Sequence, residues 1–148
     1  MTHLANNKRA RHDYEILEKF EAGLVLTGAE VKSAKAGRVN LQGAYVIPKA
    51  GELWLIGMNI APYMPAKGAQ TGYDAERDRK LLLKSKEVAY LLGKQAAKGL
   101  TVVPLSVYTR HRFIKVELGV GRGKTQHDKR NVLRRRETER EIRRSLKK

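Results

Sequence analysis

The chain has 148 residues, of which 41% are hydrophobic and 31% charged, and 31 Lys and Arg against 15 Asp and Glu give it a net charge of +16. It contains no cysteine, which excludes a disulfide framework, a thiolate nucleophile and a cysteine-ligated zinc site. No window approaches the roughly 20 consecutive apolar residues of a membrane-spanning helix, and residues 1–15 lack the apolar stretch of a signal peptide, so we expect a cytoplasmic protein.

The excess positive charge points to an anionic partner, with nucleic acid as the leading candidate. Residues 121–148 contain 12 of the Lys and Arg and 4 of the Asp and Glu, which is half of the net charge. The sequence therefore predicts a basic N-terminal arm over residues 1–12, one folded domain over residues 13–120 and a basic C-terminal tail over residues 121–148. Composition alone also allows a solubilising tail or one that associates with anionic membrane, but the tail has a thin apolar face and no aromatic residue, which disfavours the membrane.

The first half of the chain predicts a strand, a helix and a hairpin. Residues 1–12 repeat with neither a strand nor a helix period, whereas from Tyr14 to Leu26 the apolar residues fall mostly on even positions, as in a strand with one buried face and a bend or bulge at Gly23. Thr27 followed three positions later by Glu30 is a capping-box pattern and predicts a short helix. Residues 40–47 and 52–60 predict two strands around a turn over residues 48–51.

The second half predicts a loop, a helix and a second hairpin. Residues 62–79 are rich in Pro, Gly and polar residues and indicate a long loop. Ser85 can cap a helix that runs to Gly99, with apolar residues at 3–4 spacing. Residues 101–108 and 112–120 alternate as two antiparallel strands. The alternation places Val103, Leu105 and Val107 on one face, together with the apolar residues at positions 114, 116, 118 and 120, and it places Lys115 and Glu117 on the other.

These elements predict a mainly β protein with flanking helices, because the helices interrupt the strands without a regular βαβ cadence. An OB-fold-type antiparallel β-barrel fits the order of elements and the charge, although the pattern also allows another α+β sheet. The tail is rich in helix formers with a weak apolar face, so we expect it to be disordered when free and to become helical when its arginines meet phosphates. A solvated single helix without a partner is the alternative.

No motif predicts catalysis. The stretch Gly119–Thr125 resembles a phosphate-binding loop, but the required first glycine falls on Leu118, so we interpret these glycines as a flexible exit from the last strand. The four histidines show no pair at metal-binding helix spacing, and the carboxylates form no spaced acid–base pair. His127, which stands among cations, is either a ring that stacks on an exposed base or a solvated tail residue.

Five stretches, in the same order and along nearly the whole chain, carry a resemblance to a known family: NKRARHDYEI, FEAGLVLTGAEVKSAKAGRVNLQGAYV, NIAPY, RDRKLLL and GKTQHDKR. Together they resemble the SsrA-binding proteins, the partners of transfer-messenger RNA in bacterial ribosome rescue. The resemblance implies an OB-fold barrel and a non-enzymatic adaptor without cofactor, metal or small-molecule substrate. It also implies binding to the tRNA-like domain of transfer-messenger RNA and entry into the A site of stalled ribosomes in place of the missing anticodon arm, which permits peptide tagging (trans-translation).

The resemblance also implies two groups of contact residues, carried over by position in the matching stretches. The contacts to the tRNA-like domain are Asn7, Lys8, Arg9, Arg11, Glu21, Lys32, Arg77, Arg79, Lys80 and Leu82. The contacts to the small-subunit decoding centre and the mRNA channel are Gly123, Lys124, His127, Asp128, Lys129, Arg130 and Ile142.

Overall fold

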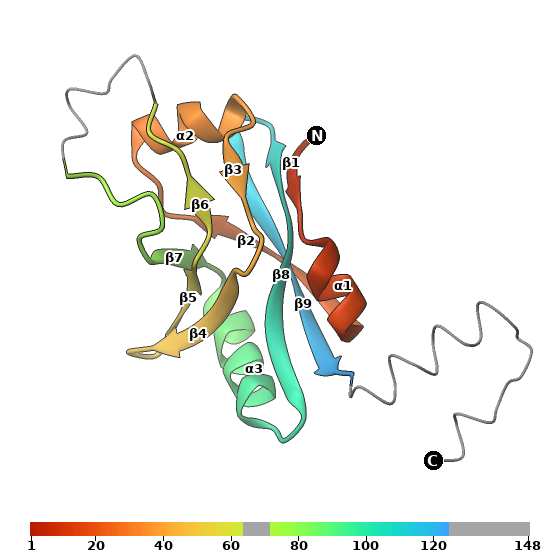
Figure 1. The fold of residues 1–148 in the computed structure, drawn as a ribbon. Helices are drawn as coiled ribbons and strands as arrows, with labels where there is room; N and C mark the ends of the chain where they lie inside the picture. The colour runs from red at the N-terminus through yellow and green to blue at the C-terminus, as the bar shows by residue number, and fades with distance from the viewer. Residues whose placement is uncertain (64–71, 125–148) are drawn as a thin grey trace, which may run out of the picture.

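One antiparallel sheet, flanked by helices, dominates the computed structural model, which describes residues 1–63 and 72–124 (Figure 1). The strands are β1 (Thr2–Asn6), β2 (Tyr14–Leu24), β3 (Val39–Asn40), β4 (Tyr45–Lys49), β5 (Glu52–Ile56), β6 (Asn59–Ile60), β7 (Arg79–Leu82), β8 (Leu100–Arg110) and β9 (Phe113–Gly123). The helices are α1 (Lys8–Asp13), α2 (Gly28–Lys35) and α3 (Ser85–Ala96).

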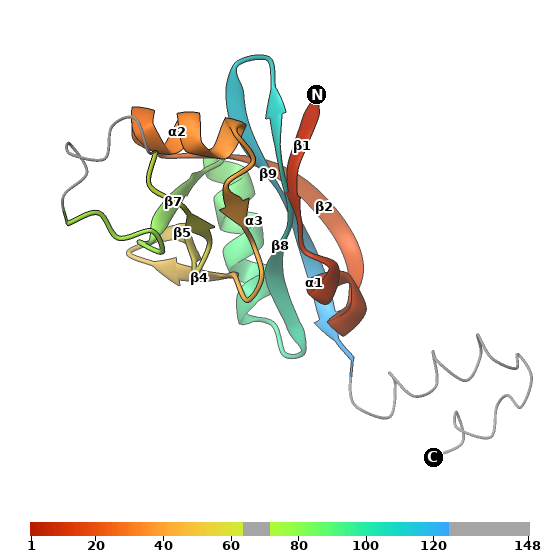
Figure 2. The same ribbon diagram turned by 45° about the horizontal axis from the view of Figure 1, so that its top comes forward.

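The main sheet has the strand order β1-β8-β9-β2-β7-β5-β4, and β3 pairs separately with β6. Its long strands β2, β8 and β9 cross the molecule, and α3 lies beside β4 and β8 (Figure 2). Gln95 of α3 links these two strands, because its amide nitrogen donates to the Val46 carbonyl and its amide oxygen accepts from the Val102 N–H, both at 2.8 Å. The prediction of a mainly β, OB-type antiparallel fold with flanking helices is confirmed.

The core lies between the sheet and the elements that cover it. Leu53 and Leu55 of β5, Leu91 of α3 and Leu118 of β9 are fully buried in one continuous apolar cluster. On β9, every second residue from Ile114 to Val120 belongs to this cluster, and Lys115 and Glu117 between them are only partly buried, as expected for a strand that turns one face to the core. The alternation expected for β9 is therefore correct.

The first thirteen residues are regular, whereas the sequence predicted an irregular arm for residues 1–12. Residues 2–6 pair with β8 as strand β1, and the Asn7 side chain caps α1 by accepting from the Ala10 N–H at 3.1 Å. Ala10, 5% exposed, packs against Val103 and Leu105. A five-residue strand and a six-residue helix are too short to show a period, so their order comes from tertiary contacts.

Strand β8 does not place its apolar residues on a single face, which corrects the prediction for Val103, Leu105 and Val107. The pairing with β9 shifts between Pro104 and Ser106, so Leu105 occupies a bulge. As a result, Val103 and Leu105 pack with Ala10 under α1, while Val107 joins the main core. The bulge exchanges the two faces, and β8 is buried on both sides from Val102 to Tyr108.

Gly119 and Gly121 lie within β9 and are not a flexible exit from it. A Cβ atom on Gly119 would stand 2.9 Å from Leu105 Cδ1 and 3.0 Å from Ile16 Cγ2, and one on Gly121 would stand 3.0 Å from Tyr14 Cβ. The two glycines therefore leave room for the apolar cluster under α1.

Four smaller boundaries differ from the predictions. The two strands predicted over residues 40–47 and 52–60 are shorter, as β4 and β5, and β3 and β6 form a separate pair. The irregularity predicted at Gly23 of β2 lies between Ile16 and Glu18. Residues 79–82, expected to follow a loop, form strand β7, and α3 is capped at Lys84 with Glu87 accepting from the Lys84 N–H. A four-residue strand between two partners is specified by its pairing, which local sequence does not display.

Candidate RNA-binding surface

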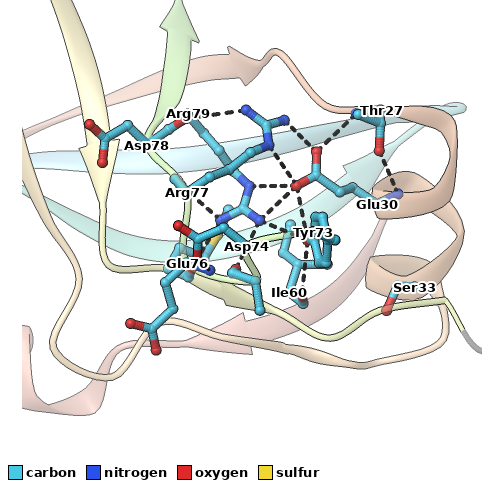
Figure 3. Close-up of polar contacts among 12 residues, drawn as sticks. Thr27, Glu30, Ser33, Ile60, Tyr73, Asp74, Glu76, Arg77, Asp78 and Arg79 are labelled. Carbon is cyan, nitrogen blue, oxygen red and sulfur yellow. Dashed lines mark hydrogen bonds and ion pairs between the residues drawn. The ribbon is translucent and has the colours of Figure 1, made fainter. Parts of the chain in front are cut away.

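Two arginines of the RDRKLLL stretch meet one buried carboxylate (Figure 3). The Thr27 N–H donates to the Glu30 carboxylate at 2.9 Å, and the Thr27 hydroxyl accepts from the Glu30 N–H at 3.1 Å, as the capping-box pattern predicts. Glu30 is only 1% exposed, and Arg77 and Arg79 both donate to its carboxylate. Glu30, which completes the capping box of α2, is thus also the counter-charge for Arg77 and Arg79.

Arg79 is part of the protein interior, which corrects its expected role as an RNA contact. Its side chain is 0% exposed, and its guanidinium donates to Glu30 Oε2 at 2.7 Å and 3.1 Å and to the carbonyl of Met58 at 2.6 Å. It also donates to the Ala75 carbonyl and the Tyr73 hydroxyl, each at 3.0 Å. A guanidinium enclosed in this way holds α2, β7 and the segment before β7 together.

The network keeps Glu30 ionised. Burial by itself would raise the pKa of this carboxyl, but hydrogen bonds from Arg77, from the Thr27 N–H and from Arg79 outweigh burial and lower the pKa to about 2. The Glu30 charge is therefore present throughout the physiological pH range.

Arg77 is partly committed to the same network. Its guanidinium donates to the Glu30 carboxylate, to the Asp78 carbonyl at 3.2 Å and to the Val25 carbonyl at 3.3 Å. Because its side chain is still 33% exposed, Arg77 presents positive charge at the surface but has few donors left for a phosphate.

Glu21, the carboxylate among the predicted contacts to the tRNA-like domain, lies on the outer face of the sheet. It accepts hydrogen bonds from the Tyr108 hydroxyl at 2.5 Å and from Arg110 Nε at 2.8 Å. The Tyr108 bond is the main reason that the pKa of Glu21 is lowered, with Arg110 adding to it and burial opposing it. Burial and this same bond raise the pKa of Tyr108 to about 12. At neutral pH, Glu21 is thus an anion that fixes the positions of Tyr108 and Arg110.

Strand pairing extends this face toward α1. Glu21 stands opposite Glu117, and Tyr108 stands opposite Lys115, so these side chains share one side of the sheet. Arg11 of α1 reaches Glu117, with 3.4 Å between Nη2 and Oε1. The structure therefore brings two of the predicted contacts, Arg11 and Glu21, onto the same face.

The other end of this face is apolar. Leu82 pairs with Gly23, and its side chain is 50% exposed. Phe113, at the tip of the β8–β9 hairpin, is 60% exposed, and the Lys115 ammonium lies 5.7 Å from its ring centroid. Leu82, Phe113 and Lys115 line a hollow of about 290 Å³. An exposed ring with cations beside it suits stacking with a nucleic-acid base.

We refer to this continuous set as the outer strip, and it consists of Arg11, Glu21, Leu82, Tyr108, Arg110, Phe113, Lys115 and Glu117. The sequence identified three of its members as contacts, and the five that it did not identify are Tyr108, Arg110, Phe113, Lys115 and Glu117. The alternation of residues 112–120 placed Lys115 on the face opposite the apolar residues, and this is the sequence feature that indicates a surface position for Lys115. Glu21 and Arg110 are 89 residues apart in the sequence, and only the pairing of their strands in the sheet brings them together.

The remaining predicted contacts are dispersed. Asn7 is 5% exposed, and because it caps α1 and donates to the Pro104 carbonyl at 2.9 Å its role is internal. Lys8 and Arg9 are exposed on α1. Lys32 lies on α2 with its ammonium 5.6 Å from the centroid of the Tyr63 ring, and Lys80 lies on β7 with Nζ 3.8 Å from Glu52.

Only the first two predicted ribosome contacts can be placed. Gly123 ends β9, and the Lys124 N–H donates to the Asp13 carbonyl at 2.8 Å, so the chain leaves the barrel beside α1. His127, Asp128, Lys129, Arg130 and Ile142 lie outside the described residues.

Within residues 1–63 and 72–124, no group of three or more His, Asp or Glu side chains is arranged to hold a metal ion. Among those residues there is also no helix long and apolar enough to cross a membrane.

Comparison with known proteins gives a consistent result. The family model described as "SmpB protein" matches residues 4–148. The chain belongs to the SmpB family. The SsrA-binding protein of Coprothermobacter proteolyticus is 53% identical over 142 residues, covering 95% of this chain and 94% of the relative. The SsrA-binding protein of Trichormus variabilis is 48% identical over 144 residues, covering 97% and 92%.

A solved structure has the same fold. It is described as "tmRNA-SmpB: a journey to the center of the bacterial ribosome", and the match has a TM-score of 0.68 at 48% identity, covering 88% of this chain and 94% of that one. The family match spans every described element from Leu4 onward, so SmpB membership applies to the barrel, to α1 and to the basic tail as one sequence.

Proposed function

We propose that this protein is a non-enzymatic RNA-binding adaptor that binds the tRNA-like domain of transfer-messenger RNA and brings it to stalled ribosomes in the cytoplasm for trans-translation. Family membership carries this proposal, since the relatives are named SsrA-binding proteins and the matched structure is described by transfer-messenger RNA, SmpB and the ribosome. The net charge of +16 supports an RNA partner.

The outer strip is the surface that we assign to the tRNA-like domain. It offers Arg11, Arg110 and Lys115 to phosphates, and the exposed Phe113 and Leu82 to a base or ribose. Lys8, Arg9, Lys32, Arg77 and Lys80 add positive charge from neighbouring elements. Asn7 and Arg79 act from within, by fixing α1 and β7.

We assign the tail, beginning at Gly123 and Lys124, to the ribosome. Half of the net positive charge lies in residues 121–148, which suits a second RNA surface. In this assignment, His127 stacks on a ribosomal base, residues 128–130 contact the decoding centre, and Ile142 is the apolar contact of a helix in the empty mRNA channel.

Competition binding tests the proposed function. The tRNA-like domain of transfer-messenger RNA is labelled and competed at near-physiological salt with elongator tRNA and with an unrelated structured RNA of equal length. We expect the unlabelled tRNA-like domain to compete far better than the other two, whereas equal competition by all three would show a generic basic protein and reject the proposal.

The assignment of the outer strip has its own test. Phe113→Ala removes an exposed ring and should weaken binding to the tRNA-like domain by about 1–3 kcal/mol, the typical contribution of one stacked base. Tyr90→Ala is the matched control, because Tyr90 is another aromatic residue at the surface, 42% exposed on α3, and α3 packs on the core side of the sheet, opposite the strip. If both variants bind like the parent protein, Phe113 does not contact the RNA.

A further inference from the structure

A polar hollow of about 720 Å³ lies between α1 and the segment that contains β3. It is lined by residues from two separate parts of the chain: Asn6, Lys8, Arg9 and His12 around α1, and Asn40 and Gln42 at the end of β3 and just after it. Its volume lies within the range of roughly 300–1,000 Å³ typical of small-ligand sites. The outer strip shares none of these residues, so this is a separate feature of the surface.

The chemistry of the lining is that of nucleotide recognition. Lys8 and Arg9 supply two cations, and Asp13 at the edge of the hollow is engaged by Arg9 at 3.5 Å and by His12 at 3.1 Å. The Arg9 side chain is 76% exposed, so this ion pair leaves its charge accessible to a phosphate. Amide side chains of Asn and Gln present a donor and an acceptor together, which matches the paired donor and acceptor edge of adenine.

Two amides of the hollow remain available for a ligand. Asn7 is occupied internally by its bonds to Ala10 and Pro104. Asn40 Oδ1 accepts from the backbone N–H of Gln42 at 2.7 Å, which fixes the turn after β3 and orients Gln42. Within the described parts of the chain, the Asn6 and Gln42 side chains make no hydrogen bond, and both residues are exposed. Exposed amides beside solvent-accessible cations form a site that can read a base while its phosphate is held.

We propose that this hollow binds one unpaired nucleotide of RNA, with Gln42 reading the base edge and Lys8 and Arg9 holding the phosphate. The hollow adjoins the point where the chain leaves the barrel, because Lys124 donates to the Asp13 carbonyl. Transfer-messenger RNA and ribosomal RNA are the two possible sources of this nucleotide. The inference rests on the proposed function and adds a second site of RNA recognition on the folded domain.

Site-specific photo-crosslinking identifies the source. A photoactivatable amino acid replaces Gln42 in the full-length protein, which is irradiated with transfer-messenger RNA alone and with stalled ribosomes carrying that RNA, and the crosslinked nucleotides are mapped by reverse transcription. We expect a crosslink to one nucleotide or its direct neighbours in one of the two arms. The same amino acid at Lys98, exposed beyond α3, is the control for random contact. Crosslinks that are absent or spread as widely as those from position 98 would overturn the proposal.

Binding to the crosslinked RNA separates base reading from charge. Gln42→Ala should weaken binding roughly 5- to 100-fold and leave the salt dependence unchanged, since no charge is lost. Lys8→Ala should lower the slope of log K against log salt by about 0.7, which is the effect of one single-stranded phosphate contact. Lys98→Ala is the matched control and should change neither quantity.

The outcomes distinguish this inference from the proposed function. If Gln42→Ala keeps parental affinity while the parent protein prefers the tRNA-like domain, the inference is wrong and the proposed function stands. If the parent protein shows no such preference but position 42 crosslinks to one ribosomal nucleotide, the proposed function fails and the hollow is still an RNA site. An unchanged melting temperature for each variant establishes that these effects arise at the surface.

Discussion

At the residue scale, the ion-pair network around Glu30 is the most consequential feature. Glu30→Gln would leave the fully buried Arg79 without its counter-charge, so we expect the free energy of unfolding to fall by about 3–5 kcal/mol. Urea denaturation measures this loss. The control is Glu52→Gln, which removes the carboxylate beside Lys80. The Glu52 side chain is 43% exposed and that of Lys80 is 38% exposed, so this variant should lose less than about 1 kcal/mol of stability. Equal losses in the two variants would contradict the structural role of Glu30.

The same residue predicts how stability depends on pH. The folded-state pKa of Glu30 is about 2, below the ordinary value of 4.5, so the unfolded chain binds a proton at higher pH than the folded protein does. The stability that this group contributes is complete above about pH 4.5 and is lost as pH falls toward 2. Stability measured between pH 7 and pH 3 should decline at the acid end in the parent protein, and Glu30→Gln should show a smaller decline. An identical pH profile for both would show that the pKa of Glu30 does not differ between the folded and the unfolded chain.

At the scale of single elements, β9 depends on glycine for space. Gly119→Ala places a methyl group 2.9 Å from Leu105 and 3.0 Å from Ile16, and the resulting displacement of these side chains on β8 and β2 should cost about 1–3 kcal/mol. Gly93→Ala is the matched control, because Gly93 lies in α3 with nothing within 4 Å of the added atom. Alanine there should raise stability by about 0.5–1 kcal/mol through helix propensity. Thermal unfolding of the two variants should therefore shift in opposite directions.

At the scale of the whole molecule, the folded domain and the tail are assigned to two different RNA partners, the tRNA-like domain and the ribosome. Removing residues 125–148 should leave binding to the tRNA-like domain within a few-fold of the parent protein, because the outer strip and α1 are retained, and should abolish peptide tagging on stalled ribosomes. The truncation point is Lys124, since Gly123 still pairs with Tyr14 and Lys124 still bonds to Asp13. Loss of both activities, or of neither, would contradict two separate RNA surfaces.

Local sequence determined the elements whose signal is complete within a few residues. The capping box at Thr27 and Glu30 defined α2, and alternating apolar residues defined β2, β9 and the antiparallel character of the sheet. The net charge of +16, half of which lies in residues 121–148, indicated a nucleic-acid partner. The five matched stretches indicated the family. These features require only a fixed spacing along the chain, which is visible without the fold.

Tertiary structure decided everything that depends on which segments meet. Arg79 looked like a surface cation and is buried, because β7 lies between β2 and β5 and turns Arg79 toward Glu30, 49 residues away. The faces of β8 exchange at Leu105, since α1 covers one side of that strand and the core the other. Gln42 and Lys8 share a hollow only because α1 docks beside β3. Burial and long-range pairing set the roles of these residues, and neither is encoded in their immediate neighbours.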